Sequence, residues 1–547
     1  MSQYRPRQAH LLQDCVFLAS LVALSVALYT DQLGFYYDDW ALLGHMLTSE
    51  DPSFFGLLHT LFSEVPNLQN RPIQVLYCAA LHWLFGVNPR WYHLTNAGVF
   101  LSGILLLYLS LQALRVPRVL SVAIPAVYAL MPNYSTDRFW YTVFSANLSM
   151  SLYGAALYCE ARALRRRRWW LWQITSVVSL LISGLAYEVF LPLFLLNPVL
   201  VWYLTRSPDT PGSKHFPWGS WMVKGAVVIV LLVFKVLTTT RLEQASVSVR
   251  QHLFLNSWLF REAIAMNYLT YGFGLPLVFW KVLREYTDTM VMIGGGIIGL
   301  IVFAYVYRLG TDLDRRMRSI PAMLWLTLLG FGVFGLGYAV FMFNYTLGFT
   351  PAGVANRTAI AAALGVAVSL VAVARAVSAW WRSTLAQRGV FAAGIAMLCA
   401  MGFTIISIIA SFWVKAYEKE QDILAGVRQT FVTLPAHSTL ILDGFCPYVG
   451  PAVVFTIDWD VTGALMVLYK QRDIRGDVVL PYTRVTENSL VIHQEYPYRQ
   501  LYVYHHAQRI GVELTNAQVA RWYFATFNPD YTNGCPPFQG EHGVPFF

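Results

Sequence analysis

The sequence predicts a polytopic α-helical membrane protein that carries a C-terminal α/β domain. Three observations support this fold class. Of the 547 residues, 56% are hydrophobic and only 13% are charged, whereas soluble globular proteins carry roughly 25% charged residues. Apolar runs long enough to cross a bilayer recur through residues 1–414. From about Lys415 onward charged residues return, and no apolar run is long enough to span a membrane.

The apolar runs predict about eleven transmembrane helices, because each span needs roughly 20 mainly apolar residues. We place them at residues 15–33, 91–113, 119–132, 140–161, 169–186, 189–205, 218–239, 289–307, 320–343, 358–381 and 389–413. Two further runs, 72–86 and 264–284, are shorter or are interrupted by polar residues, Gly and Pro. We expect both to lie along the membrane interface or to re-enter the bilayer.

The distribution of charge predicts the orientation of these spans. Lys and Arg collect in the loops of one side, led by the run Arg165–Arg168, and cytoplasmic loops are the ones enriched in these residues. The N-terminus is therefore expected in the cytoplasm, and an odd number of spans places the C-terminal domain outside. The net charge of +9 then reflects topology, and no nucleic-acid partner is expected. We expect a bacterial inner (plasma) membrane, with the C-terminal domain periplasmic or extracellular.

Residues 1–414 are predicted to form the transmembrane module, with a first outer loop at 34–90, and residues 415–547 a soluble extracytoplasmic domain. Short alternating runs near Ser438 and Gln500, bounded by Gly and Pro, predict strands in this tail. Its cysteines are Cys446 and Cys535. An oxidising compartment permits a disulfide between them, and the alternative is two buried free thiols.

The first outer loop opens with the sequence Gly34-Phe-Tyr-Tyr-Asp-Asp-Trp40. Asp38 and Asp39 are adjacent carboxylates just beyond a membrane span, where acids are costly unless they are used or solvated. One of them is a candidate general base that takes a proton from an acceptor hydroxyl. The alternative is a solvated helix cap. The pair also leaves open a divalent metal ion, although the sequence has no CxxC or HExxH spacing.

Two further segments follow the acid pair along the chain, and the second of them runs into the second predicted span. They read Asn70-Arg71-Pro72 and then Phe85-Gly-Val-Asn-Pro-Arg-Trp-Tyr-His93-Leu-Thr-Asn96. This order resembles the GT-C glycosyltransferases, and within them the branch of the protein O-mannosyltransferases. The resemblance implies an enzyme that takes a sugar from a polyprenyl-phosphate donor on the outer face of the membrane. It also implies supporting roles for Arg71 and His93.

The same resemblance extends to the second outer loop and to the turn after the fifth span. The loop holds Asp137 and Arg138 ahead of Trp140, where the family has an acid in a short Pro-containing loop. The turn holds Tyr187 and Glu188, where the family usually has Lys-Glu, so the substitution at 187 argues against phosphate binding there. The alternatives are an exposed ion pair at 137–138 and a surface charge at 188.

Donor-phosphate binding is implied for Arg357, which opens the tenth predicted span from the outer side. An Arg at this position can meet phosphate oxygens with two hydrogen bonds, and the alternative is snorkelling to the lipid head groups. Arg241 and Lys235, at the outer end of the seventh predicted span, are further candidates for this role. They could equally be interfacial anchors.

The sequence thus predicts an inverting glycosyltransferase that acts on a glycan, lipid or protein acceptor. Three alternatives remain open at this point. A lipid-linked glycan polymerase or ligase would also work outside the membrane but would transfer a whole glycan. A secondary transporter or flippase would place ionisable residues near the bilayer midplane, whereas these acids collect at its outer boundary. A non-catalytic scaffold would use the tail to bind a partner.

Overall fold

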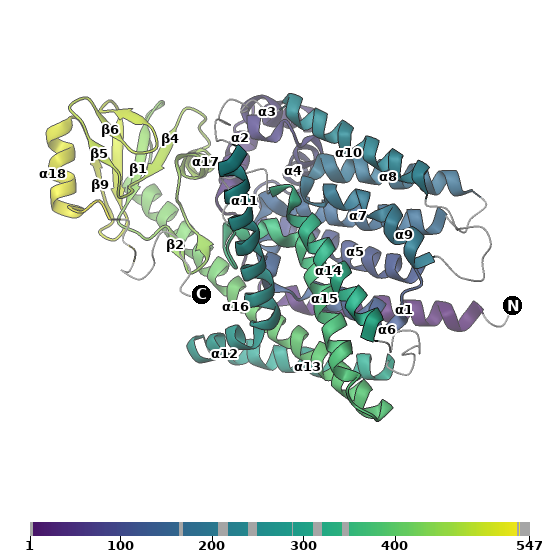
Figure 1. The fold of residues 1–547 in the computed structure, drawn as a ribbon. Coiled ribbons are helices and arrows are strands. Elements are labelled where there is room, and N and C mark those ends of the chain that lie inside the picture. Colours follow the sequence, from purple (N-terminus) through teal and green to yellow (C-terminus); the bar gives the residue numbers. More distant parts are fainter. Residues whose placement is uncertain are drawn as a thin grey trace.

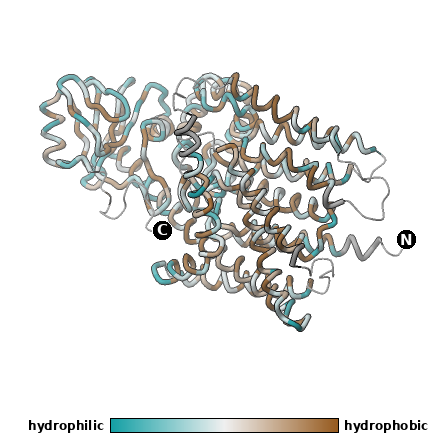
Figure 2. The backbone as a smooth tube through the Cα atoms, viewed as in Figure 1, coloured by the Kyte–Doolittle hydropathy of each residue, from teal (hydrophilic) through white to brown (hydrophobic). Residues whose placement is uncertain are grey.

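The computed structural model describes residues 4–163, 168–205, 217–238, 249–286, 288–309, 320–341, 349–532 and 535. A helical bundle occupies most of the molecule, and a smaller domain with strands lies at one end of it (Figure 1). Helix α1 (Tyr4–Ala27) begins at the end of the bundle far from this tail domain. Apolar residues concentrate along the bundle helices, whereas the tail domain is more hydrophilic (Figure 2).

Eight described helices are long and apolar enough to cross a membrane. They are α1, α5 (Pro89–Ala113), α8 (Trp169–Ala186), α10 (Trp218–Thr238), α13 (Thr289–Leu309), α14 (Ile320–Ala339), α15 (Ile360–Ser378) and α16 (Thr384–Thr430). The predicted fold class, a polytopic helical membrane protein with a strand-containing C-terminal domain, is confirmed.

Three of the eleven predicted spans differ from this set. The run at 119–132 forms the short helix α6 (Arg118–Ala129), which contains Pro125. The run at 189–205 is divided into the 3₁₀ segment η4 (Glu188–Leu195), which contains Pro192, and α9 (Asn197–Thr205). The run at 140–161 becomes α7 (Phe144–Ala163), which packs against α5 and α8 and buries Ser and Asn side chains. Two of these apolar runs thus contain a proline and form short helices, and the third forms a helix with buried polar side chains. Hydropathy alone counts all three as full spans.

Shorter elements build the tail-side end of the bundle, the end on which the tail domain sits. The first loop folds into α2 (Asp38–Leu47), α3 (Phe54–Glu64), η1 (Pro66–Leu68) and α4 (Pro72–Phe85), and the second loop into η2 (Pro132–Arg138) and η3 (Tyr141–Val143). The predicted re-entrant run at 264–284 follows α11 (Val249–Ile264) as the π-helix η6 (Ala265–Phe273) and α12 (Leu275–Glu285). The turn η10 (Val354–Ala359) precedes α15.

Helix α16 continues without interruption past Lys415 to Thr430. The domain boundary predicted at 415 therefore falls inside a helix, and the first strand begins at Thr439. The composition changes at 415, but the helix continues and still buries residues such as Ala416, Glu420 and Ile423.

The tail domain is built on a four-stranded sheet in the order β4-β1-β8-β9. Strand β1 (Thr439–Asp443) is buried along its whole length and pairs in parallel with β4 (Arg475–Val478) and β8 (Leu501–His505), while β9 (Ile510–Glu513) is antiparallel to β8. Two small antiparallel sheets hold β2 (Tyr448–Val449) with β3 (Ala452–Val453), and β5 (Arg484–Val485) with β6 (Ser489–Val491) and β7 (Glu495–Pro497). Helices α17 (Asp458–Tyr469) and α18 (Ala517–Phe527) complete the domain.

The tail domain docks on the bundle through α17, which packs against α2. The two helices approach closely at Gly44 and Gly463. A Cβ atom on Gly463 would lie 2.3 Å from the backbone carbonyl of Trp40, so only glycine fits at this position. The Trp40 indole donates to Glu420 of α16 over 3.2 Å, and Arg472 of the tail pairs with Glu64 of α3. These contacts hold the tail domain against α2, the helix that begins with the acid pair.

Candidate functional site

Helix α2 begins with the acid pair and is preceded by a strained residue. Tyr37 has φ 52° and ψ −121°, a backbone conformation that is rare for residues other than glycine. Its ring packs edge-on against Trp140 of the second loop and Trp459 of α17, with centroids 5.6 and 5.9 Å apart. Strain of this kind persists when surrounding contacts over-determine it, and it is concentrated at functional sites. Here the two ring contacts hold Tyr37 in this conformation, directly before Asp38 at the start of α2.

Asp39 is fully buried, and both of its carboxylate oxygens accept hydrogen bonds. The donors are the backbone N–H groups of Tyr36 (2.9 Å), Tyr141 (3.2 Å) and Thr142 (2.8 Å), and the Thr142 hydroxyl (2.6 Å). Burial raises the pKa of Asp39 to about 7, although the Thr142 and Tyr36 donors oppose this rise. Asp39 therefore ties the first loop to the second and has no free oxygen to offer a substrate.

Asp38 is partly exposed and has one described side-chain partner, Trp459, whose indole N–H donates to it over 2.8 Å. Burial raises the pKa of Asp38, while the nearby guanidinium of Arg357 and the Trp459 hydrogen bond lower it. The Asp38 carboxylate thus has acceptor capacity left, whereas both oxygens of Asp39 already accept hydrogen bonds.

Arg357 lies in η10, a turn that is tied to the second loop. Gly353 takes φ +85° and its carbonyl accepts from the Thr136 hydroxyl over 2.6 Å. The Asn356 side chain accepts from the Thr136 N–H over 3.2 Å and donates to the Pro132 carbonyl over 3.2 Å. These bonds hold the Arg357 guanidinium 4.9 Å from the centroid of the Trp140 ring, with one bond to the Val354 carbonyl.

The second-loop pair does not form the exposed ion pair that its sequence allows. Asp137 is fully buried, and neither carboxylate oxygen has a hydrogen-bond partner among the described residues. Burial raises the pKa of Asp137 well above its ordinary value, against the lowering effect of Arg357 and Arg138. Arg138 turns into the bundle, donates to the Ala129 carbonyl and lies 4.6 Å from the Phe100 ring centroid. Arg138 thus contacts the interior of the bundle, and Asp137 is buried close enough to Arg357 for that cation to lower its pKa.

Glu188 forms a network with two cations that come from distant parts of the chain. Arg71 donates to both of its oxygens, one of them over 3.0 Å, and lies 4.2 Å from the Tyr187 ring centroid. Lys235 donates to Glu188 over 3.0 Å and to the Asn70 carbonyl over 3.1 Å. Burial alone would raise the pKa of Glu188, but the two cations outweigh it and hold the pKa well below its ordinary range. The network ties the first loop to the ends of η4 and α10.

The remaining predicted site residues have separate places. The His93 ring contacts the Gly34 carbonyl over 2.9 Å and is buried, so it anchors the start of the first loop. Arg241 lies outside the described residues. Cys446 and Cys535 form a disulfide. Within the described ranges no group of three or more His, Cys, Asp or Glu side chains is arranged to hold a metal ion.

Two residues of this site were missed by sequence reasoning. Trp459 is separated from Asp38 by 421 positions, and no local pattern connects a tail tryptophan with the first loop. Asn356 was inside the segment Pro351–Thr358 that drew attention to Arg357, and its amide, three residues after Gly353, was a signal for a hydrogen-bonded turn.

Comparison with known proteins gives distant structural neighbours. No protein-family model matches the sequence, and no curated protein matches it. Two crystal structures of ArnT from Cupriavidus metallidurans match the fold. The one bound to undecaprenyl phosphate has 15% identity and a TM-score of 0.35, and the match covers 84% of this chain and 89% of that chain. The apo structure has 14% identity and the same TM-score, with 84% and 88% covered. At this distance the likeness assigns no family, no residue role and no activity to this chain.

Proposed function

We propose that this chain is a membrane glycosyltransferase that moves a sugar from a polyprenyl-phosphate donor to an acceptor hydroxyl at the tail-side face of the bundle. The observation that carries the proposal is the state of Asp38. It is a partly exposed carboxylate with acceptor capacity left, and it lies close enough to Arg357 for that cation to lower its pKa. A base and a phosphate-binding cation on one side of the membrane are the two groups that this chemistry requires.

In the proposed reaction, Arg357 binds the donor phosphate and stabilises the charge that develops on it as it leaves. Asp38 accepts the proton of the acceptor hydroxyl. The acceptor oxygen bonds to the anomeric carbon as the bond from that carbon to the phosphate oxygen breaks, which inverts the configuration. Polyprenyl phosphate leaves with the bonding electrons, and Asp38 later gives its proton to water.

The Arg71–Glu188–Lys235 network has a supporting role in this proposal. Lys235 and Arg71 are already paired with Glu188, so they position the first loop and add positive potential near Asp38. A divalent ion is compatible with the proposal. Since both oxygens of Asp39 accept hydrogen bonds, Asp38 is the acid of the pair that can contact such an ion, and activity with and without EDTA measures its contribution.

The test is the mass of the cell-envelope glycan in a strain that lacks the protein and is complemented with variants. Wild type is expected to restore one sugar per acceptor, whereas a whole glycan would indicate a polymerase or ligase. Asp38→Asn is expected to lower transfer by about 10²–10⁴-fold, the range for loss of general-base catalysis. Asp31→Asn is the matched control, because Asp31 is an exposed acid that pairs with exposed Arg90. Full activity of Asp38→Asn at wild-type protein levels would overturn the proposal.

A further inference from the structure

A cavity of about 300 Å³ lies where the tail domain meets the first loop. One wall is formed by Ala41 and His45 of α2, and the other by α17, β4 and the segment around Gln494. Asp38, Ala41 and His45 are spaced by three and four residues, so they share one face of α2. The cavity therefore runs along the helix face that begins at Asp38, and we call it the junction cleft.

Trp459 connects the junction cleft to Asp38. Its side chain lines the cleft and is 44% exposed, although Trp is a residue that usually buries its ring. Its indole N–H donates to Asp38 over 2.8 Å. One end of the ring system is thus fixed at the proposed base, and an apolar face is left open to a ligand beside it.

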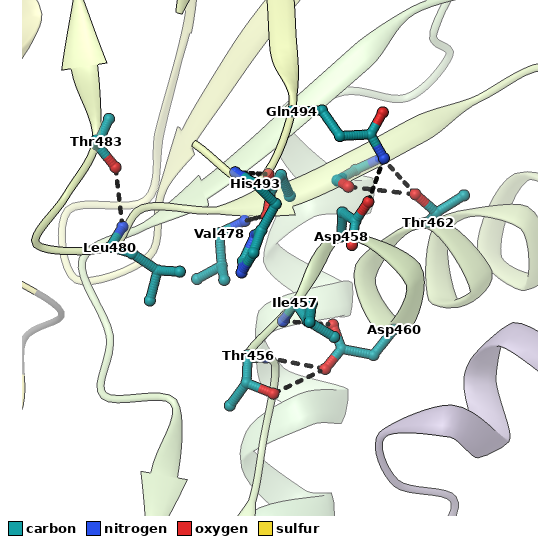
Figure 3. Close-up of polar contacts among 12 residues, drawn as sticks. Thr456, Ile457, Asp458, Asp460, Thr462, Val478, Leu480, Thr483, His493 and Gln494 are labelled. Atoms are coloured by element: carbon teal, nitrogen blue, oxygen red, sulfur yellow. Dashed lines mark hydrogen bonds and ion pairs between the residues drawn. The ribbon is translucent and has the colours of Figure 1, made fainter. Parts of the chain in front are cut away.

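Polar side chains also line the cleft beside Trp459, and hydrogen bonds to neighbouring residues hold them in place. Gln494 donates to Asp458 at the start of α17 (Figure 3). Arg475 lines the same cleft and is exposed. Buried Asp477 accepts from the His493 ring over 2.7 Å and from the Tyr496 hydroxyl over 2.9 Å. These bonds fix His493, directly before Gln494, and Tyr496, two residues after it, so the amide of Gln494 is held at the cleft beside the Asp458 carboxylate and the Arg475 guanidinium.

We propose that the junction cleft binds a saccharide unit of the acceptor and presents its hydroxyl to Asp38; this inference rests on the proposed function. A sugar ring offers an apolar face to Trp459 and hydroxyls to Gln494, Asp458 and Arg475, which can donate and accept hydrogen bonds. The volume lies at the small end of ligand pockets, which hold roughly 300–1,000 Å³. It suits one small polar unit rather than a long apolar chain.

A peptide acceptor fits this surface less well. Extended peptides add to a free strand edge, and the edge strand here is β4. Its Gly476 N–H already donates to the Thr462 hydroxyl over 2.9 Å, and that hydroxyl donates to the Gly476 carbonyl over 3.2 Å. The backbone of β4 is therefore capped by α17 at the cleft, whereas the side-chain groups point into it.

The experiment uses full-length protein in lipid nanodiscs. The acceptor is envelope glycan purified from cells that lack the protein, and the donor is the polyprenyl-phosphate-sugar fraction of the same cells. Gln494→Ala and Arg475→Ala are expected to raise the KM for the glycan about tenfold each, the scale of one lost hydrogen bond, with an unchanged KM for the donor. Arg484→Ala is the matched control, because Arg484 is an exposed arginine on β5 outside the cleft.

Binding is measured separately from turnover by saturation-transfer NMR of the same glycan on the nanodisc protein. Sugar-proton signals are expected with wild type and with Trp522→Phe, a control at an exposed α18 tryptophan, and a several-fold loss with Trp459→Phe. Signals that disappear after protease treatment of the glycan would show a protein acceptor and overturn the inference. Unchanged glycan KM in both cleft variants would also overturn it, even when Asp38→Asn abolishes transfer. Full transfer by Asp38→Asn would instead overturn the proposed function.

Discussion

Two groups of charged side chains at the tail-side end of the bundle differ in how completely their charges are matched. Around Glu188, one carboxylate accepts from two cations, and every partner comes from the bundle and its first loop. Around Asp38, the guanidinium groups of Arg357 and Arg71 lower the carboxyl pKa without a direct ion pair among the described residues, and the hydrogen-bond donor comes from the tail domain. The comparison teaches that saturated charges hold loops in place, whereas an unsaturated carboxylate close to a cation is available for chemistry.

The largest expected effect is on stability, at the saturated group. Glu188→Gln leaves Arg71 and Lys235 partly buried without their counter-charge, and breaking such a buried pair costs about 3 kcal/mol. Denaturant unfolding in detergent should show this loss, and Glu188→Gln/Lys235→Met should recover part of it. Glu487→Gln is the control, since Glu487 and its partner Arg521 are both exposed, and it should cost under about 1 kcal/mol. Equal losses for Glu188→Gln and Glu487→Gln would show that the Glu188 network does not stabilise the fold more than a surface ion pair does.

The second prediction separates the tail from the unsaturated group. In Gly463→Val the new side chain would collide with the Trp40 backbone, 2.3 Å from the position of its Cβ, so α17 must move away from α2 and Trp459 from Asp38. Transfer is expected to fall at least about tenfold, or 1.4 kcal/mol in barrier height. Gly225→Val of α10 is the control, because a Cβ there meets open space. Wild-type transfer by Gly463→Val would mean that tail docking is irrelevant to the reaction.

The third prediction concerns Asp39, the saturated neighbour of Asp38. Its pKa is raised to about 7 in the folded protein by burial, against an unfolded value near 3.9. Between pH 4 and pH 7 the folded state therefore holds more protons, and its stability falls as pH rises, by roughly 1 kcal/mol per pH unit from this group. Asp39→Asn should flatten that slope in unfolding experiments. An identical slope in wild type and variant would show that Asp39 does not titrate in this interval.

The smallest expected effect is a shift in the pH profile of transfer. The base must be ionised, so activity falls as pH drops through the pKa of Asp38. Trp459 and Arg357 both lower that pKa, and Trp459→Phe removes the hydrogen bond that does so. The acid limb of kcat should therefore move to higher pH, by less than about one unit. A shift to lower pH would contradict the role assigned to Asp38, and Trp522→Phe should leave the limb in place.

The helical membrane fold was predictable from sequence, because hydropathy is a local signal, and the order of residues in the first loop was enough to single out the acid pair as a candidate. The choice between Asp38 and Asp39 was not predictable. That choice depends on the backbone of Tyr37 and on donors from Thr142, a residue of another loop. Lys235 was interpreted as a phosphate ligand or an anchor, and its pairing with Glu188 depends on how α10 packs beside η4. Sequence patterns report faces and spans, but they do not report which distant side chains meet.

Helix α16 has a mechanical consequence. At 1.5 Å per residue its 47 residues extend about 70 Å, more than twice the roughly 30 Å of the hydrocarbon core. The tail domain is thus joined to the bundle by a continuous helix and not by an irregular linker. If the chain acts as proposed, the length of α16 sets the distance between the lipid and the junction cleft, and substrates whose reacting unit lies at that distance are expected to react best.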